Sequence, residues 1–561
     1  DIYDGAPVRF VGEGAFRDCA YLERVTFGEN SNVTSIGGYA FSGCRRLEAF
    51  TIPETVTEIG TYAFENCATL EEITLTGQSV TVGNYAFSGC ESLDSVSIGA
   101  SVESFNFILV FNDCAAITTV NVDPNNAFFA TYDDVLYNKD LTTLIFCPRG
   151  RTEVSIADST LVIGDNAFES CQITDVTLPD GVTTIGAKAF RESALTQITL
   201  PESLLSICDE AFCSSKVTAL AIPESATQIG KSAFSSCRSL KSVTLPSTLT
   251  SIGERMFYSC SALESIKIPE TVTSIGAYAF TSCSALPEIV LPAGVTEIGA
   301  NAFQSCSSIE SMVISSGVTG INNYLFQSCS SLTSVTLPAG IKSIGMMAFY
   351  SCRALSEITL PSGLESIGST SFANCAALTS VVIPETVTSI GSSAFYNCGS
   401  LTALDLPDGI SSTASNAFQN CFSLQSITLP AALTAINSSL FSGCTALKSL
   451  VLPEGLLTIG SSAFSNCKSL TELQLPASVV TVSAGAFTGC AALSLTVDQA
   501  NTHLTVQNGV LYENRSSALG DDAARQPLRR LHRIEGSRHQ RSHYRHRQLR
   551  VPQYRDHIVH D

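Results

Sequence analysis

Cysteine is the residue type in this sequence with the widest chemical scope, because a thiolate can act as a nucleophile, a metal ligand or half of a disulfide. The chain has 21 cysteines, and eighteen of them, from Cys19 to Cys490, stand three residues after a phenylalanine. Ser193 and Ser215 take this position in two further copies of the pattern. The cysteines outside the pattern are Cys147, Cys208 and Cys213. Equivalent positions of stacked repeats point the same way, so we expect a column of buried, reduced thiols with at most occasional bridges.

The sequence offers little for metal binding or catalysis. It has no C-x-x-C pair and, within residues 1–520, a single histidine, His503, so no zinc site or Cys–His nucleophile is indicated. The same residues contain no G-x-S-x-G, H-E-x-x-H or P-loop motif. The segment V-G-E-G-A-F around Gly12 lacks the third glycine of a dinucleotide loop. We therefore predict a non-enzymatic protein without a metal or cofactor.

The charge distribution separates the last 41 residues from the rest. The 561 residues carry a formal charge of −20, but residues 521–561 hold ten arginines and six of the seven histidines and carry +5. Residues 1–520 therefore carry −25, which disfavours nucleic acid and anionic membranes as partners. Apolar residues make up 45% of the chain, but no apolar run is long enough to span a membrane as a helix.

A unit of about 23 residues recurs along most of the chain, and one copy starts at Cys260. Residues 263–268 have the L-x-x-I-x-I spacing of a short strand that faces a core, and Pro269 ends it. A second apolar pair, a turn glycine and A-F-x-x-C complete the unit and place Phe280 in the interior. The anchoring phenylalanine occurs at positions 16, 41, 64, 87, 111, 168, 190, 212 and 234, and then every 23 residues from 257 to 487.

A unit of this size cannot bury its apolar edge alone, so successive units must stack into a repeat solenoid. We predict a right-handed coil or horseshoe, with a parallel β-sheet on the concave face and short strands and helical turns on the convex face. The string L-x-x-I-x-L-P-x-x-V-T-x-I-G-x-x-A-F-x-x-C resembles the BspA-like leucine-rich repeats of large surface and secreted proteins of bacteria and protists. The resemblance covers about residues 6–520 and implies adhesion or partner binding.

The repeats are predicted to fill residues 6–114 and 151–490. Between them, residues 115–150 are expected to form a loop and a β-hairpin, with a turn at 138–140. The same pattern begins again in residues 491–519. The chain therefore carries two related insertions.

Residues 520–561 have no repeat, and we expect them to be disordered. Ordinary codons shifted by one nucleotide turn Arg547 to Gln553 into G-N-S-A-F-R-N, so we interpret this basic tail as an out-of-frame translation, which sequencing across codon 520 would test. The alternatives are an arm for nucleic acid or anionic lipid, using Tyr544 and Tyr554 beside the arginines, and a histidine-rich metal tail. The chain also starts within a unit at Asp1 without a signal peptide, as expected of an internal fragment.

Alternate residues of each predicted strand must face solvent and form the candidate binding surface. The central column consists of Thr244, Lys267, Val290, Val313, Thr336, Thr359, Val382, Asp405, Thr428, Val451 and Gln474. A neighbouring column runs from Ser242 to Glu472. Neither holds Trp, Tyr or Arg, the residue types that dominate binding hot spots. Two interpretations stay open. The threonines and valines are there because β-branched residues suit exposed strands, or the columns form a broad multivalent surface that binds weakly at each repeat.

These observations favour a non-enzymatic cell-surface or secreted protein that mediates adhesion or protein–protein interaction through its concave sheet. The expected partner is a protein or glycan on another cell or matrix, with no nucleic acid and no membrane insertion. The localisation follows from the family resemblance alone. Two alternatives stay open: a structural spacer or stalk that displays another domain, and binding of an ordered solid by the regularly spaced threonines.

Overall fold

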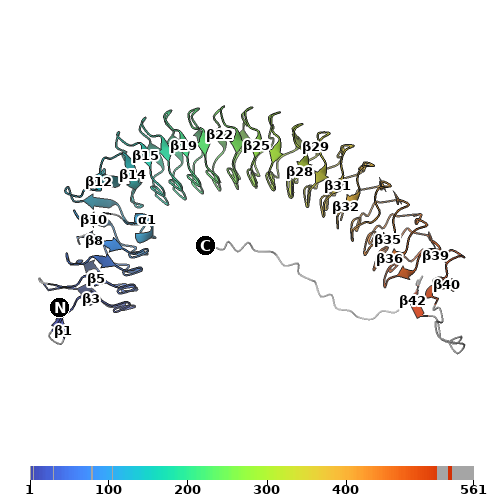
Figure 1. Cartoon of the computed structure of the whole chain (residues 1–561), viewed down its shortest axis with the longest axis horizontal. Coiled ribbons are helices and arrows are strands. Elements are labelled where there is room, and N and C mark those ends of the chain that lie inside the picture. Colours follow the sequence, from blue (N-terminus) through green and yellow to red (C-terminus); the bar gives the residue numbers. More distant parts are fainter. Residues whose placement is uncertain are drawn as a thin grey trace.

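The repeats stack into one long arch in the computed structural model (Figure 1). Each coil contributes up to two short strands and one tight turn, and the described residues contain a single helix, α1 (Phe107–Val110). The structure describes residues 2–3, 6–28, 31–76, 80–103, 105–514 and 529–533.

The first strand of a coil comes from the L-x-x-I-x-L segment. Such strands pair in parallel with no shift in register, so that Val243 lies beside Ile266 of the next coil. Together they form what we call the outer sheet. Its strands are β4 (Arg24–Val25), β6 (Ala49–Phe50), β8 (Glu72–Leu75), β10 (Ser95–Ile98), β11 (Thr119–Val122), β16 (Asp175–Thr177), β18 (Gln197–Thr199), β20 (Ala219–Ala221), β22 (Ser242–Thr244), β24 (Ser265–Ile266), β27 (Ser311–Val313), β29 (Ser334–Thr336), β33 (Ala403–Asp405), β34 (Ser426–Thr428), β37 (Glu472–Leu475) and β39 (Ser494–Val497).

The second strand of a coil comes from the V-T-x-I segment and is two residues long. These strands also pair in parallel from coil to coil, as Ser274 pairs with Glu297. They form the side sheet. Its strands are β3 (Phe10–Val11), β5 (Ser35–Ile36), β7 (Glu58–Ile59), β9 (Thr81–Val82), β15 (Val162–Ile163), β17 (Thr184–Ile185), β19 (Ser206–Ile207), β21 (Gln228–Ile229), β23 (Ser251–Ile252), β25 (Ser274–Ile275), β26 (Glu297–Ile298), β28 (Gly320–Ile321), β30 (Ser343–Ile344), β31 (Ser366–Ile367), β32 (Ser389–Ile390), β35 (Ala435–Ile436), β36 (Thr458–Ile459) and β38 (Thr481–Val482).

The A-F-x-x-C turns form a third ladder, held by backbone hydrogen bonds between coils. The amide of Phe280 donates to the carbonyl of Ala302 at 2.8 Å, and the same bond links every anchor from Phe168 to Phe464 to the next coil. Most turns contain two left-handed residues, one before the alanine and one before the cysteine, and their φ is close to +60°. Asn, Ser, Asp and Gly dominate the second of these positions, because they tolerate this conformation best.

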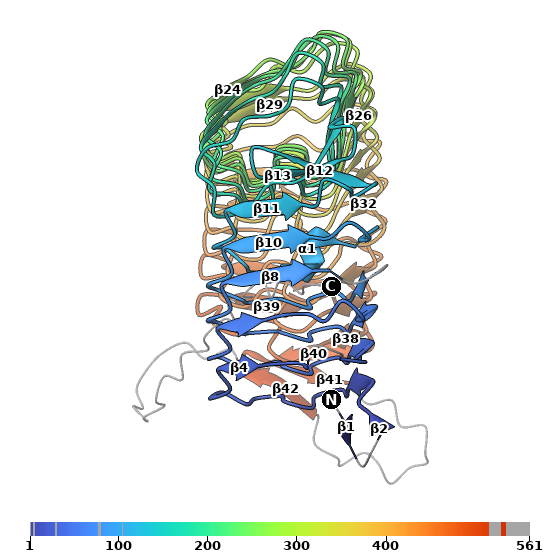
Figure 2. The same cartoon turned by 90° about the vertical axis from the view of Figure 1, so that its left-hand side faces the viewer.

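The outer sheet lies on the convex side of the arch, and the turns line its concave side. In Figure 2 the strands β8, β10 and β11 cross the outside of the limb nearest the viewer. In Figure 1 the helix α1, which stands just before the anchor Phe111, faces the inside. The predicted leucine-rich-repeat solenoid is confirmed, but the prediction that its sheet lines the concave face is wrong.

Spacing between coils explains the direction of the bend, because a stack curves toward the side on which its units lie closest. In the turns, Ser282 N donates to Gln304 O and Ser328 N to Tyr350 O, both at 2.7 Å. On the outer side the corresponding bonds range from 2.7 Å, between Ser494 N and Thr471 O, to 3.4 Å, between Ser356 N and Thr333 O. Four outer segments, at residues 288–290, 357–359, 380–382 and 449–451, form no strand.

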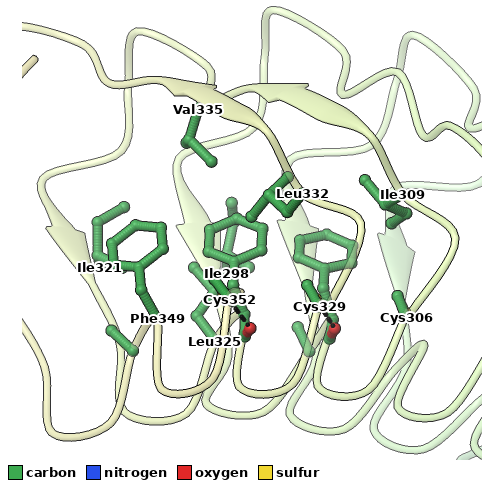
Figure 3. Close-up of a cluster of buried hydrophobic side chains, with 14 of the residues drawn as sticks. Ile298, Cys306, Ile309, Ile321, Leu325, Cys329, Leu332, Val335, Phe349 and Cys352 are labelled. Carbon is green, nitrogen blue, oxygen red and sulfur yellow. Dashed lines mark hydrogen bonds between the residues drawn. The ribbon is translucent and has the colours of Figure 1, made fainter. Parts of the chain in front are cut away.

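Two stacked columns fill the core behind the turns (Figure 3). The anchor rings lie nearly parallel, as Phe326 and Phe349 do with centroids 5.4 Å apart. Beside them the ladder thiols, except those of Cys19 and Cys171, donate to the carbonyl of the preceding anchor, as Cys352 Sγ does to Phe326 O at 3.0 Å. The thiol of Cys171 donates instead to Cys147 O. The predicted burial of the thiol column holds for every ladder cysteine except Cys19, and all 21 cysteines are free thiols. These thiols thus serve as small buried hydrogen-bond donors.

The first insertion forms a septum between two separate hydrophobic cores. It consists of β12 (Phe129–Tyr132), β13 (Val135–Asn138) and β14 (Thr143–Phe146), which pair in antiparallel order. Leu136 packs with the preceding coils, whereas Val135 and Tyr137 pack with the following ones. The predicted turn at 138–140 lies between β13 and β14. The outer sheet continues through β11, so the insertion starts after Val122 and not at residue 115.

The second insertion repeats the first with the same register. In β40 (Leu504–Gln507) and β41 (Val510–Glu513), Leu504 pairs with Glu513 as Phe129 pairs with Asn138 in the first insertion. Buried Asn126 and Asn501 hold the two insertions by equivalent bonds: each side-chain amide donates to two carbonyls of the preceding coil and accepts from two backbone amides.

Most of the predicted disordered tail lies outside the described residues. Arg529–Arg533, however, forms β42, which pairs with β41 in antiparallel order. The expectation of disorder therefore does not hold for these five residues. The backbone of β42 takes the place that β14 has in the first septum, because both meet the middle strand with the same register shift. A short terminal hairpin, β1 (Ile2–Tyr3) and β2 (Ala6–Pro7), completes the described elements.

Candidate functional site

The eleven candidate residues of the central column, Thr244, Lys267, Val290, Val313, Thr336, Thr359, Val382, Asp405, Thr428, Val451 and Gln474, are all exposed. They follow one another from coil to coil on the convex side of the arch, and not on the concave side as expected. Six lie in strands of the outer sheet, namely Thr244, Val313, Thr336, Asp405, Thr428 and Gln474. The other five lie where the outer sheet is interrupted or has just ended.

Four valines supply the apolar side chains of the column. The exposed fraction of the side chain is 73% for Val290, 66% for Val313, 81% for Val382 and 86% for Val451. Isolated apolar side chains are common on protein surfaces, but these recur at one structural position. The column can therefore offer apolar contact at several points along the convex side of the arch.

Polar contacts within the column are few and local. Thr428 Oγ1 donates to Asp405 Oδ1 across one coil step. Gln474 Nε2 donates to Asp498 Oδ2 at 3.4 Å. Neither contact gathers groups able to move a proton or hold a cation.

Cys208 is an off-ladder thiol that lines a shallow hollow with Asp165 and Asp209. Burial, followed by the negative charge of Asp165, raises its pKa above the ordinary value. The thiolate is the reactive form of cysteine. This hollow therefore keeps Cys208 in its unreactive form at neutral pH.

Sequence reasoning missed the surface that does line the concave side. We call it the inner strip, and define it as the two residues before the alanine and the two after the phenylalanine of each A-F-x-x-C turn. At its start Tyr39, Tyr62 and Tyr85 stack with ring centroids 5.0 and 5.1 Å apart. The guanidinium of Arg17 lies 4.8 Å from the centre of the Tyr39 ring. Recurrence of tyrosine just before A-F was the signal available in the sequence.

In the part of the chain that the structure describes, no group of three His, Cys, Asp or Glu side chains could hold a metal ion. Nor does that part contain a helix long and apolar enough to cross a membrane.

Family models and solved structures agree with this architecture. Residues 9–142, 161–286, 250–379 and 365–494 match the BspA type leucine-rich repeat region, a model of six copies. The matches cover most of the chain, which therefore belongs to this family.

Two solved structures illustrate the likeness. A leucine-rich repeat protein from Bacteroides ovatus is 28% identical, with 58% of this chain and 81% of that one covered and a TM-score of 0.50. A leucine-rich cell surface protein from Faecalibacterium prausnitzii is 27% identical, with 66% and 94% covered and a TM-score of 0.38. No curated protein matches the sequence.

Proposed function

We propose that this protein is a non-catalytic adhesion or recognition protein of the cell surface or of secretions, which binds a protein or glycan through the outer sheet. The observation that carries the proposal is the column of exposed valines at 290, 313, 382 and 451, repeated at one position of a rigid stack. Each contact is small, and the regular spacing lets many of them act together.

The family gives the proposal its biological setting. BspA-like leucine-rich repeats occur in surface and secreted proteins, and we infer a display or secretion role for this chain from its membership of that family. Repeat proteins present long, stiff surfaces of this kind to partners. The convex position of the sheet makes its residues accessible to a flat partner such as another cell or a matrix.

Charging the valines tests the proposal. The variant with Val290→Lys, Val313→Lys, Val382→Lys and Val451→Lys should bind cultured epithelial cells or a cell-derived matrix at least tenfold more weakly than the parent protein. The matched control carries Leu205→Lys and Leu457→Lys, which also charge exposed apolar side chains but lie beside the side sheet. Equal binding by the parent and the four-lysine variant would exclude the outer sheet as the binding surface.

A structural spacer is the second candidate. The continuous ladder of turn hydrogen bonds from Phe168 to Phe487 supports it, because such a stack resists bending. In that case both lysine variants would leave every surface interaction unchanged.

A further inference from the structure

The two halves of the inner strip differ sharply in charge. Its first ten turns, from Glu13 to Ser259, contain fifteen charged side chains among forty positions. Its last ten turns, from Ala277 to Gly489, contain none among forty. Residues 277–489 nevertheless include fourteen charged side chains, all of which lie elsewhere on their coils. We call the last ten turns of the inner strip, from Ala277 to Gly489, the uncharged stretch. Only this surface lacks charge, since the same half of the protein carries charged side chains elsewhere.

The uncharged stretch is rich in groups that form hydrogen bonds. Tyr278, Tyr324, Tyr350 and Tyr396 are half-buried along it, between many Ser, Asn, Gln and Thr residues. Tyrosine offers a large rigid contact area with a polar tip, while amides and hydroxyls supply adaptable donors and acceptors. The combination suits a ligand that is itself covered in hydroxyl groups.

Amide side chains link neighbouring turns of the stretch into short ladders. Asn301 Nδ2 donates to Gln304 Oε1 at 2.8 Å, and Gln304 Nε2 donates to Gln327 Oε1 in the next coil at 3.0 Å. Farther along, Asn397 Nδ2 donates to Asn374 Oδ1 at 2.9 Å. These bonds fix the side chains before a ligand arrives, and each amide keeps further donor or acceptor capacity.

The stretch repeats at a regular distance. Directly behind it the anchor rings from Phe280 to Phe487 are separated by 5.2 to 5.9 Å. A ligand with its own repeat on this scale can make the same contact at one coil after another, so that weak contacts add along its length.

We propose that the uncharged stretch binds the extended chain of a neutral polysaccharide along the inside of the arch. Residues 1–520 carry −25, which repels acidic glycans but leaves an uncharged chain unaffected. The stretch has no charged side chain to offer a protein partner, and Met346, at 37% exposure, is its one exposed large apolar side chain among the described residues. The uncharged stretch is separate from the outer sheet, which carries the proposed adhesion function. The polysaccharide proposal can therefore be tested independently of the adhesion proposal.

Affinity electrophoresis of the full chain tests the proposal. Native gels contain one neutral polysaccharide at a time, from a panel of a soluble β-glucan, a mannan, a xylan and a galactan, with polygalacturonate as the acidic comparison. At least one neutral polymer should retard the protein, and polygalacturonate should not. Tyr324→Ala with Tyr350→Ala should weaken that retardation at least tenfold.

Matched controls separate ligand contact from folding. Tyr62→Ala with Tyr85→Ala removes tyrosines from the charged half of the inner strip and should leave the retardation within twofold of the parent. Gln327→Glu should weaken retardation while leaving the melting temperature unchanged. Gln327 is partly exposed on the uncharged stretch. A charge added there should therefore weaken polysaccharide binding without destabilising the fold.

Three results would overturn the proposal. They are no retardation by any neutral polymer of the panel, retardation by polygalacturonate alone, and retardation that the Tyr324/Tyr350 variant leaves intact. Weaker attachment of that variant to a glycan-free protein surface, with no polysaccharide shift, would instead assign the stretch to a protein partner and would equally overturn it.

Discussion

The outer sheet and the inner turns are built from the same repeat, but hydrogen bonding between coils is more regular in the turns than in the outer sheet. The turns keep their hydrogen-bond ladder at every step from Phe168 to Phe487, with left-handed residues at fixed places. The outer sheet is interrupted at residues 288–290, 357–359, 380–382 and 449–451. The coils are therefore held together mainly through their inner side, and the outer side is free to vary.

Raising the pH should have the largest effect on stability, because it acts on the many buried thiols of the column behind the turns at once. Burial raises the pKa of Cys306 from 9.0 to about 12, and burial likewise raises that of Cys444 to about 12. The unfolded chain therefore releases these protons at lower pH than the folded one. Stability should be complete below pH 9.0 and fall steeply as the pH rises toward about 12. Circular dichroism against pH checks this, and an unchanged melting temperature up to pH 11 would contradict it.

Anchor phenylalanines should contribute more than buried residues of the outer sheet. Phe349→Ala opens a cavity in the ring column behind the turns and should cost about 3–5 kcal/mol of unfolding free energy. Val335→Ala, in β29, removes fewer buried atoms and should cost about 1–2 kcal/mol. Urea unfolding of the two variants measures the difference. Equal losses would show that the outer sheet supports the stack as strongly as the turns do.

The same serine-to-valine substitution, made once in an inner turn and once in the outer sheet, compares the conformational constraints of the two regions. Ser305 has a φ of 58° in its turn, so Ser305→Val forces a β-branched residue into the left-handed region, at a cost of about 1–2 kcal/mol. Ser311 is exposed in β27, where Ser311→Val should be neutral or slightly stabilising. Ser305→Gly is the control and should be neutral or stabilising. If both valine variants melt alike, the turn conformation is not a constraint.

Charging the outer column should have the smallest effect on stability. Val382 is exposed and forms no strand, so Val382→Lys should change the unfolding free energy by less than about 0.5 kcal/mol. Thermal unfolding checks this expectation. A loss above about 1 kcal/mol would mean that the outer surface supports the fold, and the adhesion test would then need a milder substitution.

Much of the fold could be predicted from the sequence because one short pattern repeats twenty times. The spacing of Leu263, Ile266 and Ile268 defines a strand, and the position of Cys260 after its anchor defines the thiol column. The direction of the bend could not be predicted in this way. It depends on which side of the coil packs most closely, and that is decided by backbone bonds between turns, which hydrophobic spacing does not reveal.

The candidate site was predicted correctly in exposure and wrongly in location. Alternation placed Val290 and Val451 toward solvent, as the structure has them, but assigned them to the concave side. The tyrosines that do line that side, such as Tyr62, lie outside the strands, so the alternation of apolar residues does not identify them. The equivalence of Asn126 and Asn501 could not be predicted either, because a buried amide has no periodic signature.

Hydrogen exchange, read by mass spectrometry, is the measurement that tests the central claim most directly. The claim is that the inner turns bind the coils together more tightly than the outer sheet does. Amides of the turn around Phe280 and Ser282 should exchange at least tenfold more slowly than those of the outer segment around Ile289 and Val290. Slower exchange in the outer segment would contradict the account, because it would show that the outer sheet holds the coils together more tightly than the turns do.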